Sequence, residues 1–224
     1  MIPTSALALT RLLQLASPAL PVGAYSYSQG LEAAIEARLV TDAPGAQRWI
    51  EDVLDLTLGS MEAPVFLRLA AAWDAGDAAS ARHWNEILLA SRESAELRAE
   101  MVQMGYSLAR LLTELGEAHP FDGWDEISFT AAYAWWAARS GIPHDAALTA
   151  YLWSWAENQV MAAVKTVPLG QSAGQRLLLA LGPVVAACAS RAATLGDDEL
   201  GNLAPGLALL SAQHETQYSR LFRS

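Results

Sequence analysis

Residues 92–115 read RESAELRAEMVQMGYSLARLLTEL, and the spacing of their apolar residues decides the class of fold. Leucine and methionine recur every three or four positions, at Leu97, Met101, Met104, Leu108, Leu111 and Leu112. That spacing places them on one face of a helix. Gly116 follows directly and is typical of a helix end. The stretch predicts one long amphipathic helix that buries a single face.

The same helical spacing recurs along the rest of the chain, where alanine and leucine dominate. Hardly any segment alternates with the period of a strand, and β-branched residues are sparse. Breaks built of glycine, proline and aspartate separate the helical stretches, among them residues 74–77, 119–125, 141–143 and 167–170. Residues 59–64 predict either a soft break or the start of a further helix. We therefore predict an all-α fold: one compact, bundle-like domain of about nine or ten helices covering residues 1–224.

Composition bounds the class of protein. Hydrophobic residues make up 53% and charged residues 17% of the chain, which suits a large core, a partner surface or a membrane segment. The longest uncharged run, residues 177–190, contains Gly182-Pro183 and is shorter than the roughly 20 apolar residues of a bilayer crossing. We interpret it as a buried helix. The N-terminal stretch MIPTSALALTRLLQLA lacks a basic start and carries Arg11, so we expect a cytoplasmic protein without a membrane segment.

The charge balance and the cysteine count exclude further classes. A net charge of −10 argues against nucleic acid and anionic membranes as partners, because both bind through basic surfaces. It fits solubility or basic partners. The single cysteine, Cys188, excludes an internal disulfide and zinc sites of the cysteine type. Its position in the apolar run predicts a buried, inert thiol.

No catalytic or cofactor-binding constellation is found in the sequence. GxGxxG and a Walker A loop are absent. None of the four histidines has a second histidine three or four residues away: His83, His119, His144 and His214. We therefore predict no enzymatic activity, no cofactor and no metal site within one chain. A metal shared by histidines of two subunits stays open.

Three other features indicate binding surfaces. Residues 17–32, SPALPVGAYSYSQGLE, hold two prolines, two glycines and two tyrosines, which is more than a turn needs. Lys165 ends an apolar helix; it either stabilises the helix C-terminus or presents its charge to a partner. The tail HETQYSRLFRS, residues 214–224, stays amphipathic to its end. Chain ends are usually polar, so a docking segment is favoured over a tail packed on its own domain.

The tryptophans allow two interpretations. Trp135 and Trp136 are adjacent, so we expect them to point in different directions and not to enter one core. Trp153 and Trp155 diverge in the same way. Aromatic residues are enriched at interfaces, so this pattern suits self-association as well as it suits a core with a rim.

Three segments of the chain resemble the UreF-type urease accessory proteins. They are LASPALPVGAYSYSQGLE at 15–32, AVKTVPLGQSAGQRLL at 163–178 and QHETQYSRLFRS at 213–224. Their order and spacing span nearly the whole chain. The resemblance implies an all-helical homodimer without established enzymatic activity of its own. Such proteins bind UreD (UreH in some bacteria) and recruit the GTPase UreG, and the assembly delivers nickel to apo-urease.

The resemblance also implies site residues. The GTPase is expected to dock on a surface face made by Tyr25, Ser26, Gln29, Gly30, Glu32 and Lys165. Residues of the docking tail, at about 212–224, are expected to order on binding UreD: His214, Glu215, Tyr218, Arg220, Leu221 and Phe222. The helix over residues 144–165 is expected to form the dimer through Thr149 and Trp153.

One alternative belongs to another class of protein. An all-helical enzyme would gather Tyr25, Tyr27, Glu32 and Lys165 around a closed, ligand-sized pocket. The accessory-protein hypothesis instead predicts that these side chains serve a partner surface.

Overall fold

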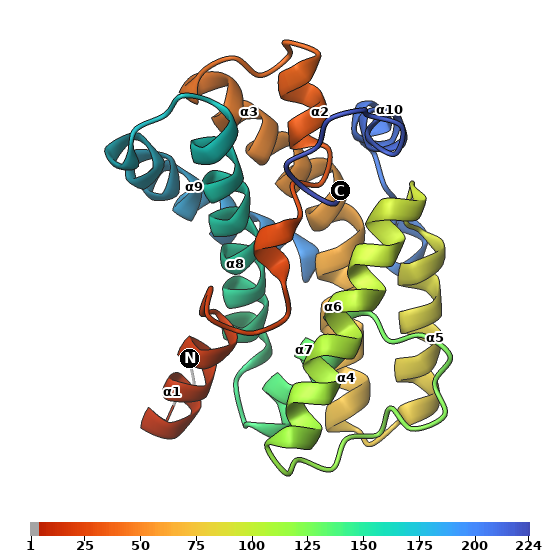
Figure 1. The fold of residues 1–224 in the computed structure, drawn as a ribbon. Coiled ribbons are helices and arrows are strands. Elements are labelled where there is room, and N and C mark those ends of the chain that lie inside the picture. The colour runs from red at the N-terminus through yellow and green to blue at the C-terminus, as the bar shows by residue number, and fades with distance from the viewer. Residues whose placement is uncertain (1–4) are drawn as a thin grey trace.

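The computed structural model describes residues 5–224, and within that range the chain forms α-helices and no β-strand. The predicted all-α class and single compact domain are confirmed; residues 1–4, where the N-terminal stretch and the predicted domain begin, lie outside the described range. The α-helices are α1 (Ala6–Leu15), α2 (Leu31–Glu36), α3 (Ala43–Val53), α4 (Ala63–Asp74), α5 (Ala78–Ala90), α6 (Ala95–Glu114), α7 (Phe129–Arg139), α8 (His144–Thr166), α9 (Gln171–Ala192) and α10 (Pro205–His214) (Figure 1).

Side-chain caps fix where several helices begin. Asp42 accepts a hydrogen bond from Gly45 N at 2.7 Å ahead of α3, and Asp77 accepts one from Ser80 N at 3.0 Å ahead of α5. Ser94 does the same for Leu97 N at 3.1 Å and starts α6. Each bond satisfies an N–H group that the first helical turn leaves unpaired. Aspartate is a favoured residue at this position, so the caps at Asp42 and Asp77 can be predicted from the sequence.

A π-helix, η2 (Leu54–Glu62), joins α3 to α4 without a break. Of the two alternatives for residues 59–64, the start of a further helix is confirmed, because α4 begins at Ala63 and the chain stays helical through the segment. A glycine is needed here because a Cβ at Gly59 would lie 2.8 Å from Cys188 Sγ on α9. The wide π turn ends just before Pro64, which has no N–H to donate. It carries Glu62 to a buried position beneath the site described below.

Helix α8 lies at the centre of the molecule and packs against α9, α2, α3, α4, α1 and α7 (Figure 1). Helix α7 lies between α4 and α6. The C-terminal tail leaves α10 and crosses back toward the segment that precedes α2 (Figure 1). This path brings Ser224 against Ser28 and Gln29 of that segment and against Glu100 of α6.

Trp135 and Trp136 both lie in the core, with 8% and 2% of their surface exposed. The expectation that they cannot enter one core is wrong. Helix α7 is buried on all sides from Thr130 to Ala137, so neighbouring side chains that point in different directions meet protein in every direction. Its sequence FTAAYAWWAAR has no charged residue before Arg139, and a helix that is apolar all round is typical of a buried one.

Helix α9 buries one face against α8 and leaves the other exposed. Leu177, Leu181 and Val185 are buried, whereas Leu179 is 80% exposed. The interpretation of residues 177–190 as a buried helix therefore holds for one face only. By length and composition α9 could cross a membrane, and a packed helix of a folded domain passes the same test. Cys188 is buried on the inner face, and burial raises the pKa of its thiol to about 11, as expected for an inert cysteine.

Candidate functional site

The segment between α1 and α2 forms a shaped loop rather than a simple turn. Gly23 has φ +81° and starts a short 3-10 helix, η1 (Ala24–Ser26). Gly30 has φ +79° and starts α2; both angles lie in the left-handed region that favours glycine. Between these glycines Tyr25 is 68% exposed, whereas the Tyr27 ring is buried. The loop therefore presents one tyrosine to solvent and anchors itself with the other.

The predicted surface residues of this loop do not all lie at the surface. Tyr25 is exposed, Ser26, Gln29 and Glu32 are half-buried, and Gly30 is buried. A Cβ at Gly30 would lie 3.0 Å from a methyl carbon of Leu207 on α10, so glycine is needed for close packing there. The expectation of a surface position is thus wrong for Gly30 and only partly right for the half-buried Ser26, Gln29 and Glu32.

Main-chain hydrogen bonds hold the tail on this loop. Ser28 N and Gln29 N donate to the Ser224 carbonyl oxygen at 2.7 and 3.1 Å, and Arg223 N donates to Ser26 O at 2.8 Å. The Ser28 hydroxyl also donates to Ser224 O at 2.6 Å. The end of the tail therefore packs on its own domain in this chain. Docking of the tail to another protein remains a prediction.

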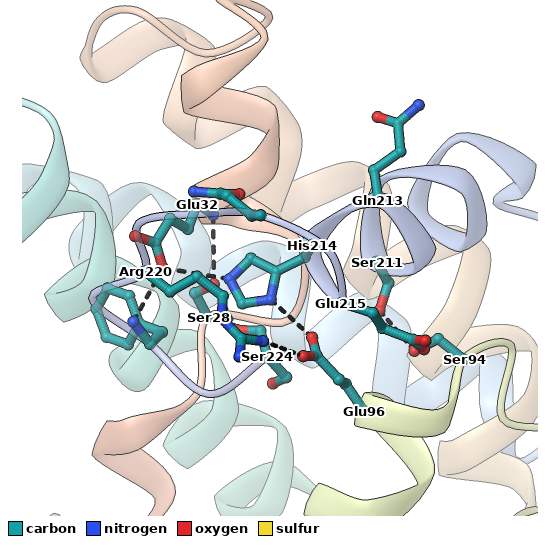
Figure 2. Close-up of polar contacts among 12 residues, drawn as sticks. Ser28, Glu32, Ser94, Glu96, Ser211, Gln213, His214, Glu215, Arg220 and Ser224 are labelled. Carbon is teal, nitrogen blue, oxygen red and sulfur yellow. Dashed lines mark hydrogen bonds and ion pairs between the residues drawn. The ribbon is translucent and has the colours of Figure 1, made fainter.

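The carboxylate of Glu32 contacts both the tail and α10. Its two oxygens accept hydrogen bonds from Leu221 N at 2.7 Å and Phe222 N at 2.9 Å. His214, fully buried, lies between Glu32 and Glu96: its Nε2 is 3.3 Å from Glu32 Oε2 and its Nδ1 is 2.6 Å from Glu96 Oε2 (Figure 2). Both ring nitrogens therefore face carboxylate oxygens.

The other predicted tail residues divide into contacts and exposed groups. Arg220 Nη1 pairs with Glu96 at 2.5 Å, and Glu215 accepts a bond from Ala95 N at 2.9 Å at the start of α6. Phe222 is buried at 6% exposure, whereas Leu221 is 64% exposed and Tyr218 is fully exposed. Two charged side chains and the Phe222 ring therefore hold the tail on the domain. The side chains of Leu221 and Tyr218 point into solvent.

Lys165 connects the tail to α8. It is the only lysine in the chain, it is exposed at the last turn of α8, and its Nζ lies 5.6 Å from the centre of the Phe222 ring. A cation over an aromatic ring at this distance is attracted to it. The structure thus brings together Lys165, the tail and the loop before α2, which the sequence singled out separately.

A cavity of about 320 Å³ opens beside Tyr25 and Lys165. Its walls come from the loop, α1, α6 and α8, and its inner end from Glu62, Arg92, Glu100 and Tyr151. Glu32 and Tyr27 do not line it. The pocket expected of an all-helical enzyme is therefore not assembled from the four predicted residues.

The inner end of this cavity holds charged groups that sequence reasoning missed. Arg92 Nη1 pairs with Glu62 Oε2 at 3.0 Å, with both side chains buried, and Tyr151 donates to Glu62 Oε1. Glu100 accepts from Gln29 Nε2 at 2.6 Å and from the Ser224 hydroxyl at 2.7 Å. Burial raises the pKa of Glu100 to about 7. A signal existed: Glu100 stands between Leu97, Met101 and Met104, on the apolar face of its helix.

The remaining predicted residues lie away from this cavity. Thr149 is exposed and Trp153 half-buried, one turn apart on α8, so one partner could contact both. Across residues 5–224 no three His, Cys, Asp or Glu side chains gather as they would around a metal ion. The arrangement offers an exposed Tyr25 ring, an ammonium group beside the Phe222 ring and a tail held by hydrogen bonds, all of which are groups suited to binding a partner.

Comparison with known proteins identifies the family. A family model described as UreF matches residues 40–182. The urease accessory protein UreF of Azoarcus sp. (strain BH72) is 57% identical over 225 residues, covering 97% of this chain and 96% of that protein. Those of Janthinobacterium sp. (strain Marseille) and Dechloromonas aromatica (strain RCB) are 53% and 52% identical, each over 97% of this chain and 98% of the relative. The chain belongs to the UreF family of urease accessory proteins.

Proposed function

We propose that this chain is a cytoplasmic scaffold and regulator in urease maturation. It binds UreD (UreH) through its C-terminal tail and the GTPase UreG through the face around Tyr25 and Lys165, while nickel is inserted into apo-urease. The chain acts as a homodimer formed through α8, with Thr149 and Trp153 in the contact. Nickel is the cargo of this assembly, and the chain itself catalyses no reaction.

The observation that carries the proposal is the contact between Lys165 and Phe222, which joins the two predicted binding regions. Their residues are 57 positions apart in sequence, yet Nζ lies 5.6 Å from the ring centre. Tyr25 and Lys165 border the same cavity. One continuous face therefore offers an exposed tyrosine, an ammonium group and the tail, and exposed aromatic and cationic groups are typical of protein-binding surfaces.

Two observations speak for an accessory role over an enzyme. The cavity lacks Glu32, whose carboxylate is committed to the Leu221 and Phe222 amides. The Cys188 thiol is buried, and its pKa of about 11 leaves no reactive thiolate. The family membership points the same way, because the relatives named above are urease accessory proteins.

Reconstitution tests the proposal. The chain is mixed with UreD, UreG, apo-urease, nickel, bicarbonate and GTP, and urease activity is compared with and without it. Tyr25→Ala and Lys165→Ala are expected to reduce UreG capture at least tenfold, and deletion of residues 215–224 to abolish UreD capture. Leu179→Ala, at an exposed site on α9, is the matched control. Normal activation without the chain, or normal capture by the variants, contradicts the proposal.

The dimer contact has its own test. Trp153→Arg is expected to convert the chain to a monomer in light scattering, because the new charge would have to be buried at the contact. A dimer that persists in Trp153→Arg and in Thr149→Arg places the contact elsewhere.

A further inference from the structure

The cavity beside Tyr25 and Lys165 combines apolar walls with a charged inner end. Its walls are formed mainly by the apolar side chains of Leu15, Leu20, Leu97, Met101, Met104 and Phe129. Its inner end is formed by the buried residues Glu62, Arg92, Glu100 and Tyr151. A cavity with apolar walls and buried ionisable groups suits a ligand with an aliphatic stem and a charged tip.

Of the two carboxyl groups at the inner end, only that of Glu62 has a cation beside it in the part of the chain that the structure describes. Glu62 has its own cation in Arg92. Glu100 is 5% exposed, and within residues 5–224 no lysine, arginine or histidine nitrogen lies within ion-pair distance of its carboxylate. Its partners, Gln29 and Ser224, are neutral donors. A buried carboxylate without a cation favours its protonated form, in line with the pKa of about 7 at Glu100.

We propose that this cavity receives a lysine or arginine side chain of the protein that docks on the Tyr25–Lys165 face, with the basic group placed beside Glu100. The inference rests on the proposed function, because it needs that face to bind a partner. The aliphatic stem lies along Met101 and Met104, whose flexible side chains adapt to an inserted group. The basic tip supplies the missing positive charge.

Other occupants fit less well. An anion would meet two carboxylates, and the unpaired Nε and Nη2 of Arg92 have less than 1 Å² of accessible surface each, so they are sealed from the cavity. A metal ion would find two carboxylates that are already hydrogen-bonded. A purely apolar side chain would fill the walls but leave Glu100 without a cation.

Insertion of the basic side chain changes the protonation of Glu100. Near pH 7 the carboxyl group is partly protonated in the free chain. A cation beside it favours the carboxylate, so the Glu100 proton passes to the buffer as the partner binds. The titratable groups that face Glu100 are Glu62, Arg92 and Tyr27. Glu62 and Arg92 pair with each other, and burial raises the pKa of Tyr27 above its usual value of 10, so near pH 7 the release is assigned to Glu100.

Calorimetry tests the inference with two variants. The complex of this chain with UreD is titrated with UreG at pH 7 in two buffers of different ionisation enthalpy. The wild type is expected to release protons, and Glu100→Gln to release none and to bind about tenfold more weakly. Ser154→Phe, which adds a ring from a half-buried lining position on α8, is expected to weaken binding at least tenfold. Leu179→Phe, on the exposed face of α9, is the control for an added ring.

The outcomes separate the two proposals. Failure of the wild-type complex to bind UreG contradicts the proposed function. Wild-type affinity in both Ser154→Phe and Glu100→Gln, or equal proton release in the wild type and Glu100→Gln, overturns the inserted side chain and leaves the proposed function standing. Glu100→Gln keeps the volume and hydrogen-bonding shape of the side chain, so it remains informative if Ser154→Phe does not fold.

Discussion

The ammonium group of Lys165 lies over the ring of Phe222, with Nζ 5.6 Å from the ring centre. The ring is buried in a small cluster that includes Leu31 and Ala34 of α2 and Ala162 of α8. It is the one apolar side chain among residues 215–224 that the domain buries. The tail is therefore anchored at one point and otherwise held by polar contacts, so it belongs to the parts of a fold that open most easily.

Phe222→Ala tests this anchor. Removing the ring should release residues 220–224 locally, because the polar contacts that remain can be replaced by water. Amide hydrogens of Leu221, Phe222 and Arg223 are expected to exchange at least tenfold faster, while the far-ultraviolet circular dichroism stays unchanged. Tyr218→Ala, at a fully exposed ring in the same tail, is expected to change nothing. Equal exchange in Phe222→Ala and the wild type would show that the ring does not hold the tail.

His214→Gln tests the buried charge cluster (Figure 2). The imidazole is fully buried between Glu32 and Glu96, whose side chains are 12% and 16% exposed. Removing the imidazole leaves each of these carboxylates with one hydrogen-bond partner fewer, and an unsatisfied buried polar group costs about 1–3 kcal/mol of unfolding free energy. Urea denaturation measures it.

An exposed pair provides the control for His214. His144 Nε2 lies 2.8 Å from Asp74, with side chains 33% and 57% exposed. His144→Gln should change the unfolding free energy by less than about 1 kcal/mol, because solvent screens an exposed pair. Similar losses of unfolding free energy in His214→Gln and His144→Gln would show that the buried cluster stabilises the fold no more than the exposed pair.

Glu100 should make stability fall as pH rises from acid to neutral. Burial raises its pKa from 4.5 to about 7, so between these values the folded chain binds more protons than the unfolded chain. The stabilisation is complete below about pH 4.5 and is lost as pH rises through about 7. The difference in unfolding free energy between the wild type and Glu100→Gln should shift by about 3 kcal/mol between pH 4.5 and pH 8. A pH-independent difference would show that the carboxyl group titrates normally.

The all-α fold could be predicted from the sequence because helical spacing is a local property. The stripe from Leu97 to Leu112 predicts α6, and Asp42 and Asp77 predict the starts of α3 and α5, each within a few residues of the chain. The π-helix at Leu54–Glu62 was not predicted, because no short sequence pattern distinguishes a wide helical turn at Gly59 from a break.

The site was predictable only in part, because its contacts join distant segments. Tyr25 and Lys165 could be singled out by composition and by resemblance. Their neighbours could not: Ser28 with Ser224 spans 196 positions, and Glu32 with Phe222 spans 190. The role of Glu100 depends on a cavity that forms only when α1, α6 and α8 meet.

Gly105→Ala tests the closest approach between α6 and the segment before α7. A Cβ at Gly105 would lie 2.0 Å from the carbonyl oxygen of Ile127. That backbone cannot retreat easily, because Asn85 holds it on both sides: Nδ2 donates to Glu126 O at 3.0 Å, and Ser128 N donates to Oδ1 at 2.8 Å. Alanine should therefore lower the unfolding free energy by about 3 kcal/mol, although it is the better helix former.

Gly206→Ala is the matched control for that substitution. Gly206 lies in the first turn of α10, and a Cβ there would meet nothing within 4 Å. Without a clash, alanine should leave stability unchanged or raise it by up to about 1 kcal/mol through helix propensity. Urea midpoints of the two variants measure the difference. Equal stability of Gly105→Ala and Gly206→Ala would mean that the Ile127 backbone moves away without cost. The hydrogen bonds of Asn85 would then not explain why α6 has a glycine at its middle.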